Sequence, residues 1–215
     1  LRIMEELDLL KKAWQKDTQS FQQVTENEIY KMLHKNSSSS VKWILIISIL
    51  EFALWTFISV FFNTDEYIKQ MHAEEMMIYL KILTYVNYAV ILWFLYRFYT
   101  NYVKISATTS TKQLMQDILR TRKTVQNYVW YNLGMMFVSM IIGFIMAFLY
   151  NPQLSVIKDK IAHDEGNGII IKIVCFLSLA TIVFLVIFWL FYKLLYGFLL
   201  RRLSNNYKEL KKIDL

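Results

Sequence analysis

The sequence has few residues that break helices and few that build catalytic or metal sites. Its 215 residues include one proline, five glycines, one cysteine and three histidines. The lone Cys175 cannot form an intramolecular disulfide, which excludes the disulfide framework of small secreted domains. No glycine-rich phosphate loop, nucleophile elbow or paired-cysteine motif is present. We therefore expect a protein that is not an enzyme, with no cofactor and no metal site.

Apolar residues are abundant instead and make up 56% of the chain, which is too many for an ordinary soluble domain. Four segments reach the roughly 20 apolar residues that cross a hydrocarbon core of about 30 Å. They lie at residues 41–62, 78–98, 128–150 and 169–192. Each must be helical, because an open sheet edge would leave backbone groups unpaired in lipid. The predicted fold is all-α, a polytopic membrane protein with a four-transmembrane-helix bundle.

Lysine and arginine lie mainly on one side of this predicted bundle. The segment through Lys42, the connection from Arg97 to Lys123 and the tail from Lys193 hold nineteen of them, and the other two connections hold three. The positive-inside rule then predicts a protein of the inner membrane with both termini cytoplasmic. The formal net charge of +7 follows from this topology. Anionic lipid headgroups are the expected partner, and nucleic acid is not.

Residues 1–40 are predicted to form a cytoplasmic amphipathic segment before a membrane domain at 41–200, and residues 201–215 a basic helical tail. Leu7, Leu10 and Trp14 recur at intervals of three and four residues, which gives an apolar stripe beside charged side chains. This stripe either packs within a small cytoplasmic cap or docks a protein partner or the membrane surface.

A second cytoplasmic helix is predicted from the pair Thr25 and Glu28, which has the spacing of a capping box. Ser37–Ser40 follow it, and we expect this serine tract to be a hinge at the membrane surface. Residues 111–126 contain apolar positions without proline or glycine, so the second and third spans are expected to project past the bilayer as longer helices.

Glu51 stands in the middle of the first apolar segment with no other charge near it. It lies about ten residues from the cytoplasmic edge of its span, or roughly 15 Å at the rise of an α-helix. Asn87, Ser139 and Thr181 fall at a similar depth when counted from the edges of their own spans, and Ser48 shares a helical face with Glu51. These five residues are predicted to form an intramembrane polar layer.

A charged carboxylate at mid-membrane costs about 2.5–3.5 kcal/mol on insertion scales, which favours a protonated Glu51. We expect this side chain to form a hydrogen bond with Asn87 as a packing and register device. A proton or cation relay through Glu51 is the alternative interpretation.

The stretch FQQVTENEIYKMLHKNSSSSVKWILIISILEF, with LDLLKKAWQKD before it, resembles a group of small four-span membrane proteins from Bacteroidetes. This resemblance implies a four-span fold and no particular activity. Some members carry a carotene-oxygenase label, which would imply a propeller with four iron-binding histidines. This chain has three histidines and a different predicted architecture, so that activity is not expected here.

Two classes of function follow from these observations. The first is a binding, regulatory or scaffolding component whose cytoplasmic helices hold a partner. Its N-terminal helices are similar to those of membrane anti-sigma factors, although the zinc-binding histidine and cysteines of many such domains are absent. The second is a small transporter or channel that uses the Glu51 layer and assembles as a homo-oligomer. The shortage of glycine and proline within the spans favours the first class.

Overall fold

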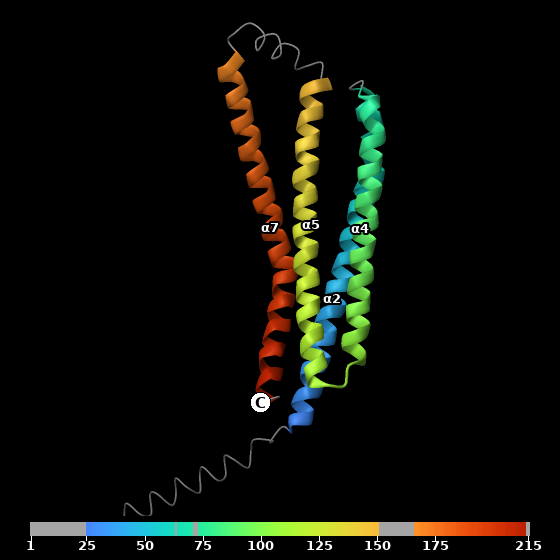
Figure 1. Ribbon diagram of the computed structural model, residues 1–215, viewed down its shortest axis with the longest axis vertical. Helices are drawn as coiled ribbons and strands as arrows, with labels where there is room; N and C mark the ends of the chain where they lie inside the picture. Colours follow the sequence, from blue (N-terminus) through green and yellow to red (C-terminus); the bar gives the residue numbers. More distant parts are fainter. Residues whose placement is uncertain (1–24, 63, 71–72, 151–165, 214–215) are drawn as a thin grey trace, which may run out of the picture.

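The computed structural model describes residues 25–62, 64–70, 73–150 and 166–213. Four long helices lie side by side, and a short helix follows the first of them (Figure 1). They are α2 (Glu26–Phe61), α3 (Thr64–Gln70), α4 (Glu74–Ala107), α5 (Thr111–Tyr150) and α7 (Gly166–Ile213). Each of the four long helices is long and apolar enough to cross a membrane. The fold of the described residues is thus all-α, as expected, and indicates a multi-pass membrane protein.

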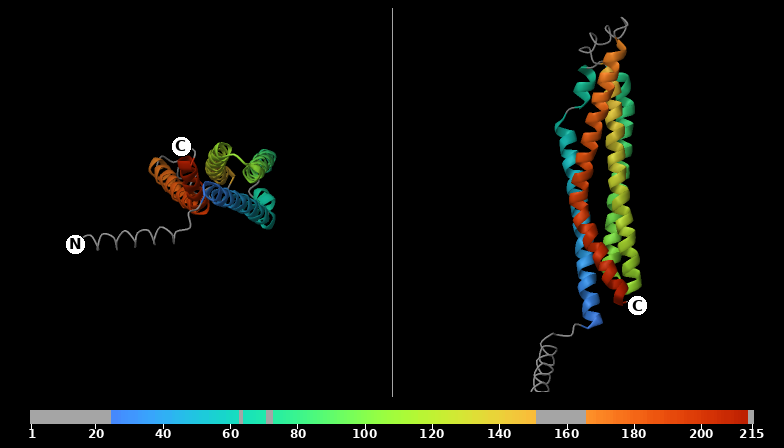
Figure 2. Two further views of the ribbon diagram at one scale, coloured as in Figure 1. Left: turned by 90° about the horizontal axis from the view of Figure 1, so that it is seen from below. Right: turned by 90° about the vertical axis from the view of Figure 1, so that its left-hand side faces the viewer.

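The four long helices form a ring in which each packs on two neighbours, in the order α2, α4, α5 and α7 (Figure 2). The start of α2, the turn between α4 and α5, and the end of α7 lie at the same end of the bundle (Figure 1). Only residues 108–110 separate α4 from α5, so these two apolar segments do continue as longer helices. The short turn forces the two helices to be antiparallel neighbours.

The capping box predicted at Thr25 and Glu28 is confirmed at the start of α2. The Glu28 N–H donates to the Thr25 hydroxyl, and the Thr25 N–H donates to the Glu28 carboxylate at 2.9 Å. These bonds satisfy backbone donors that a helix start otherwise leaves without partners. The hydrogen bonds from Thr25 hold the pKa of the exposed Glu28 carboxyl below its ordinary value.

The serine tract Ser37–Ser40 is helical, so the expected hinge at this place is wrong. Helix α2 runs through it without a break, and Ser37 and Ser40 are fully buried. The small side chains allow α7 to approach, and Asn206 Nδ2 donates to Ser37 Oγ at 3.0 Å. Ser40 Oγ donates to the carbonyl of Asn36 in its own helix, which satisfies its hydroxyl. Helix packing thus overrides the weak helix propensity of serine.

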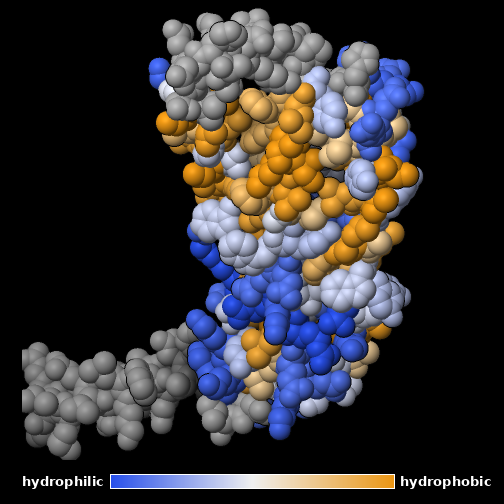
Figure 3. Space-filling view, turned by 45° about the horizontal axis from the view of Figure 1, so that its top comes forward, coloured by the Kyte–Doolittle hydropathy of each residue, from blue (hydrophilic) through white to orange (hydrophobic). Residues whose placement is uncertain are grey.

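The bundle has two halves that differ in surface and in packing (Figure 3). We call the half with the hydrophilic surface the charged half; it comprises residues 25–51, 94–128 and 192–213. The remainder of the described residues, 52–62, 64–70, 73–93, 129–150 and 166–191, is called the apolar half. Figure 3 shows hydrophobic residues gathered over the apolar half on the visible face.

Most of the fully buried apolar side chains lie in the charged half. Those with no exposed surface include Val41, Ile44, Phe98, Ile105, Leu114, Ile118, Val125, Leu203 and Leu210. The apolar half has a smaller cluster, in which Ile68 of α3 and Met146 of α5 are buried. Toward its Gly166 end α7 diverges from α5 (Figure 1), and few residues in the most apolar stretch of α7 are buried. Lipid is therefore the expected environment for the apolar half, and the charged half holds the protein core.

Candidate functional site

Glu51 lies at the junction of the two halves, where its carboxyl group accepts hydrogen bonds from three tyrosines. Tyr128 and Tyr196 both donate to Oε2 at 3.0 Å, and Tyr192 donates to Oε1. Glu51 is 8% exposed and each of the three tyrosines 2% or less. The cluster is thus a buried polar site inside an apolar bundle.

The helices place these side chains by register and by ring packing. Tyr192 and Tyr196 are one turn apart on α7, so both face α2, and their rings stack with centroids 6.2 Å apart. Tyr128 of α5 packs edge-on against Phe94 and Phe98 of α4, each at 5.4 Å between centroids. All four long helices therefore meet at this level.

Each buried polar side-chain group of the cluster has a hydrogen-bond partner. Among the described residues, no buried side-chain nitrogen or oxygen lacks a hydrogen-bond partner. A phenol hydroxyl can both donate and accept, so three tyrosines can surround either a protonated or an ionised Glu51. The protonated state expected from the sequence stays a prediction.

The hydrogen bond expected between Glu51 and Asn87 is wrong, because each side chain has other partners. Asn87 Oδ1 accepts from the hydroxyl of Tyr131 at 3.0 Å. Ser48 is buried beside Glu51 in α2 and donates to the carbonyl of Leu45 at 2.9 Å. Thr181 is 7% exposed and donates to the carbonyl of Leu177 at 2.8 Å. The hydroxyls of Ser48 and Thr181 thus form their hydrogen bonds within their own helices.

The predicted layer residues also lie at different levels of the bundle. Ser139 follows Tyr128 by eleven residues on α5, which is roughly 16 Å along a helix. Thr181 precedes Tyr192 by the same number of residues on α7. The estimate from the sequence assumed that all four apolar segments begin at one level. In the structure Asn36, near the start of the first segment, accepts from Arg202 of α7 at 2.8 Å, so this segment begins beside the polar end of α7.

Exposed aromatic side chains surround the bundle near the level of Glu51. Trp93 of α4 is 53% exposed, Trp130 of α5 70% and Trp189 of α7 42%. Arg97 lies over the Trp93 ring at 5.5 Å, and Lys193 lies over the Trp189 ring at 4.7 Å. Tryptophan together with lysine and arginine is typical of the membrane–water interface. From this pattern we expect Glu51 to lie nearer the interface than the sequence alone predicts.

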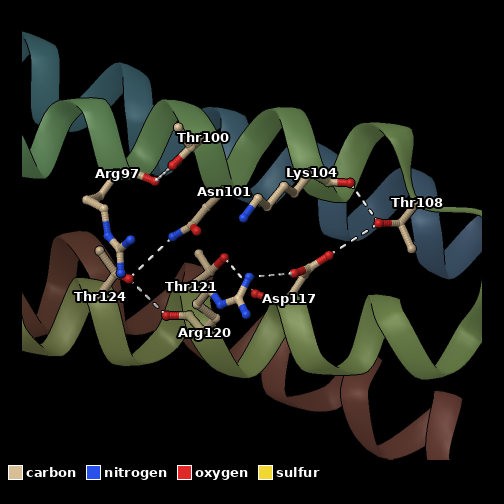
Figure 4. A network of polar contacts seen from close by, with 9 residues as sticks. All are labelled: Arg97, Thr100, Asn101, Lys104, Thr108, Asp117, Arg120, Thr121 and Thr124. Atoms are coloured by element: carbon tan, nitrogen blue, oxygen red, sulfur yellow. Dashed lines mark hydrogen bonds and ion pairs between the residues drawn. The ribbon is translucent and has the colours of Figure 1, made fainter.

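Specific polar contacts join α4 and α5 in the charged half (Figure 4). Asn101 Nδ2 donates to Thr124 Oγ1 at 3.3 Å, and the hydroxyl of Thr108 lies 3.2 Å from a carboxylate oxygen of Asp117. All four residues are buried. Directed bonds of this kind fix the register of two helices more sharply than apolar packing alone.

A cavity of about 410 Å³ occupies the apolar half between α4 and α5. Two of the predicted layer residues, Asn87 and Ser139, line it together with Asn132. Tyr128 of the Glu51 cluster also lines the cavity, at its end nearest the charged half. The predicted layer thus includes two residues of a cavity and one carboxyl group of a separate, adjoining cluster.

Other expectations from the sequence concern residues elsewhere. The expected partner face of Leu7, Leu10 and Trp14 lies outside the described residues. Within the described ranges, no group of three histidine, cysteine, aspartate or glutamate side chains could hold a metal ion.

Sequence reasoning did not find Tyr128, Tyr192 and Tyr196. One signal was available, because Tyr192 and Tyr196 are four residues apart and share a helical face at the end of a predicted span. The sequence did not indicate which residue of another helix would face them.

A family model described as a domain of unknown function, DUF8845, matches residues 27–215 of the chain. The match begins one residue after the start of α2 and includes the rest of α2 and all of the later described helices. No curated protein and no solved structure matches the chain.

Proposed function

The chain belongs to the DUF8845 family, and we propose that it is a non-enzymatic binding, regulatory or scaffolding component of the inner membrane. In this proposal both termini are cytoplasmic, and the cytoplasmic helices engage a partner protein. Tethering of a soluble regulator, in the manner of a membrane anti-sigma factor, is one version of it. The resemblance to small four-span proteins of Bacteroidetes supports a bacterial inner membrane as the location.

The observation that carries this proposal is the excess length and tight packing of the helices in the charged half. The four long helices have 36, 34, 40 and 48 residues, whereas crossing a membrane takes about 20. The excess lies largely in the charged half, which also holds most of the core. Anchoring in the membrane does not require helices of this length. A rigid bundle that extends beyond the bilayer instead offers a fixed surface to a soluble partner.

Charge supports both the orientation and the kind of partner. Lysine and arginine greatly outnumber aspartate and glutamate in the charged half. The positive-inside rule then favours the cytoplasm for this half. Arg97 and Lys193, beside the exposed tryptophans, are suited to anionic headgroups. Lysines farther from the tryptophans, such as Lys31 and Lys35 of α2, are suited to an acidic protein surface.

The test is affinity purification in a gentle detergent, with retained proteins identified by mass spectrometry. We expect a cytosolic protein to be retained by the intact chain. The double variant Lys31→Glu/Lys35→Glu should lower the retained amount by about tenfold or more, because charges at the rim of an interface steer association. Lys69→Glu is the matched control, since Lys69 is an exposed lysine of α3 at the opposite end of the bundle. A second variant, Leu10→Ser/Trp14→Ser, tests the apolar face expected near the N-terminus.

Loss of the same protein with either set of changes, and its retention by Lys69→Glu, would support a cytoplasmic docking surface. Equal retention by the intact chain and by both variants would contradict the proposal.

One observation supports a transporter or channel as the alternative function: the cavity adjoins the Glu51 cluster at Tyr128. This arrangement favours it as the second candidate function. The test is proton or cation flux in vesicles that contain the protein. Flux with the intact chain that is abolished by Glu51→Gln would favour this candidate over the first.

A further inference from the structure

The cavity between α4 and α5 has the size and the walls of a small-molecule site. Its volume of about 410 Å³ lies within the range of roughly 300–1,000 Å³ that is usual for ligand pockets. Phe52 and Trp55 of α2 and Phe184 of α7 line it beside the residues of α4 and α5. Side chains from all four long helices therefore form this one cavity.

Polar atoms of three residues that line the cavity, Asn132, Asn87 and Ser139, have no hydrogen-bond partner within the part of the chain that the structure describes. Asn132 Nδ2 donates to the carbonyl of Tyr128 at 2.9 Å, which leaves Asn132 Oδ1 as a free acceptor. Asn87 Oδ1 accepts from Tyr131, which leaves Asn87 Nδ2 as a free donor. The Ser139 hydroxyl makes no bond to a described residue, whereas Thr84 in the same wall donates to the carbonyl of Leu80.

These free atoms matter because the cavity lies in the apolar half. A polar group without a partner in an apolar medium is unfavourable, and acyl chains cannot supply a hydrogen bond. Asn87 is held at the level of Tyr131, the residue next to Asn132, so the two asparagines lie at a similar level of the cavity. Ser139 lies seven residues farther along α5, or about 10 Å away.

The chemistry of the walls defines the ligand. Among the described residues that line the cavity none is charged, so an ionic headgroup would find no counter-charge. A free amide N–H and a free amide carbonyl oxygen together match a hydroxyl group, which accepts one hydrogen bond and donates another. Met135, Met136 and Met140 form flexible walls that adapt to an apolar body.

We propose that this cavity binds a neutral, lipid-soluble molecule with a hydroxyl head and a long apolar body, of the class of long-chain alcohols. The head lies between Asn87 Nδ2 and Asn132 Oδ1, and the body runs outward along α5 past the methionines. This site adjoins the Glu51 cluster at Tyr128 but does not include Glu51, and it does not rest on the proposed cytoplasmic partner.

The apolar groove between α2 and α7 serves as an internal comparison. It has a volume of about 500 Å³, and its lining is apolar, with residues such as Ile47, Leu54 and Phe191, except for Glu51. The Glu51 carboxyl group already accepts hydrogen bonds from three tyrosines. An acyl chain satisfies such a surface without any head-group contact, so this groove is expected to bind lipid without discrimination.

The experiment is photolabelling of the full chain in phospholipid vesicles with a long-chain alcohol that carries a diazirine, followed by peptide mapping. We expect labelled residues to cluster at 132–140 of α5 and 84–91 of α4. A fatty acid probe with the same chain and diazirine tests the requirement for a neutral head. Loss of one hydrogen bond of about 1.4 kcal/mol corresponds to about a tenfold loss of occupancy, so Asn132→Leu should lower labelling by that factor.

Ser139→Phe should also lower labelling by about tenfold or more, because the ring would fill the cavity while breaking no described hydrogen bond. Thr56→Val is the matched control, since Thr56 bonds within its own helix to the carbonyl of Phe52 and does not line the cavity. It should leave labelling unchanged. If Ser139→Phe does not fold, Asn132→Leu decides the question, because Asn132 bonds only within its own helix.

Labelling spread evenly over the lipid-facing helices would overturn the proposal. Equal labelling by the alcohol and the fatty acid, or labelling that neither cavity variant reduces, would overturn it as well.

Discussion

Glu51→Leu is expected to destabilise the bundle by about 3–5 kcal/mol, because it leaves three buried tyrosine hydroxyls without their shared acceptor. Each buried hydroxyl that loses its partner costs roughly 1–3 kcal/mol, and two of the three sit on the same helix, so part of the loss can be recovered locally. Glu51→Gln keeps a carbonyl acceptor at the same place, and we expect it to cost about 1 kcal/mol. The measurement is the free energy of unfolding in mild detergent.

A rescue experiment separates this hydrogen-bond effect from a change of shape. Replacing both partners of a buried hydrogen bond by apolar groups of similar shape can be nearly neutral. Tyr128→Phe, Tyr192→Phe and Tyr196→Phe, added together to Glu51→Leu, should therefore restore most of the lost stability. Ser59→Leu, a change to the same residue at an exposed position of α2, is the control and should have little effect. A Glu51→Leu variant as stable as this control would refute a structural role for the cluster.

Phe98→Ala is expected to cost about 3–5 kcal/mol of unfolding free energy, the usual range for emptying a phenylalanine site in a core. Phe98 lies in α4 within the charged half, has no exposed surface and packs against the ring of Tyr128 at 5.4 Å. The cavity left by the change cannot close easily, because Phe94 and Tyr128 also support the Glu51 cluster.

Phe198→Ala provides the matched control for this change. Phe198 lies in α7, also within the charged half, but is 70% exposed, so its removal should change the unfolding free energy by less than about 1 kcal/mol. Similar losses for the two variants would contradict the assignment of the core to the interior of the charged half.

The helices themselves could be predicted from the sequence, because the signals for them are local. Long apolar segments without proline indicate helices that reach across a bilayer, and the capping box at Thr25 and Glu28 marks the start of α2. The level of one helix against another could not be predicted in the same way. Counting inward from the first apolar residue treated Val41 as a membrane edge, whereas Val41 is buried in the core of the charged half.

The partners of Glu51 show the physical reason for this limit. Tyr192 and Tyr196 are 141 and 145 residues away along the chain, and no local pattern links them to Glu51. Their proximity depends on how α2 and α7 slide against each other, which contacts such as Asn206 to Ser37 fix. Asn87 had the right chemistry to be a partner of Glu51 but lies at the level of Tyr131. Side-chain type alone could not distinguish these arrangements.

The serine tract shows a similar ambiguity between local and tertiary signals. Four consecutive serines have weak helix propensity, which favours a break in the helix. The same small side chains also let two helices pack closely, and the structure has this second outcome at Ser37 and Ser40. A sequence read one segment at a time does not reveal whether another helix covers the tract.

The most direct test of the account is the accessibility of single cysteines to a membrane-impermeant thiol reagent, in vesicles of both orientations and in a Cys175→Ser background. Met32→Cys lies in the charged half at a position that is 52% exposed, and Leu179→Cys lies in the apolar half at one that is 62% exposed. We expect Met32→Cys to react from the cytoplasmic side only and Leu179→Cys to be protected from both sides. Reaction of Met32→Cys from the external side, or reaction of Leu179→Cys as fast as that of Met32→Cys, would contradict a cytoplasmic charged half above a membrane-embedded apolar half.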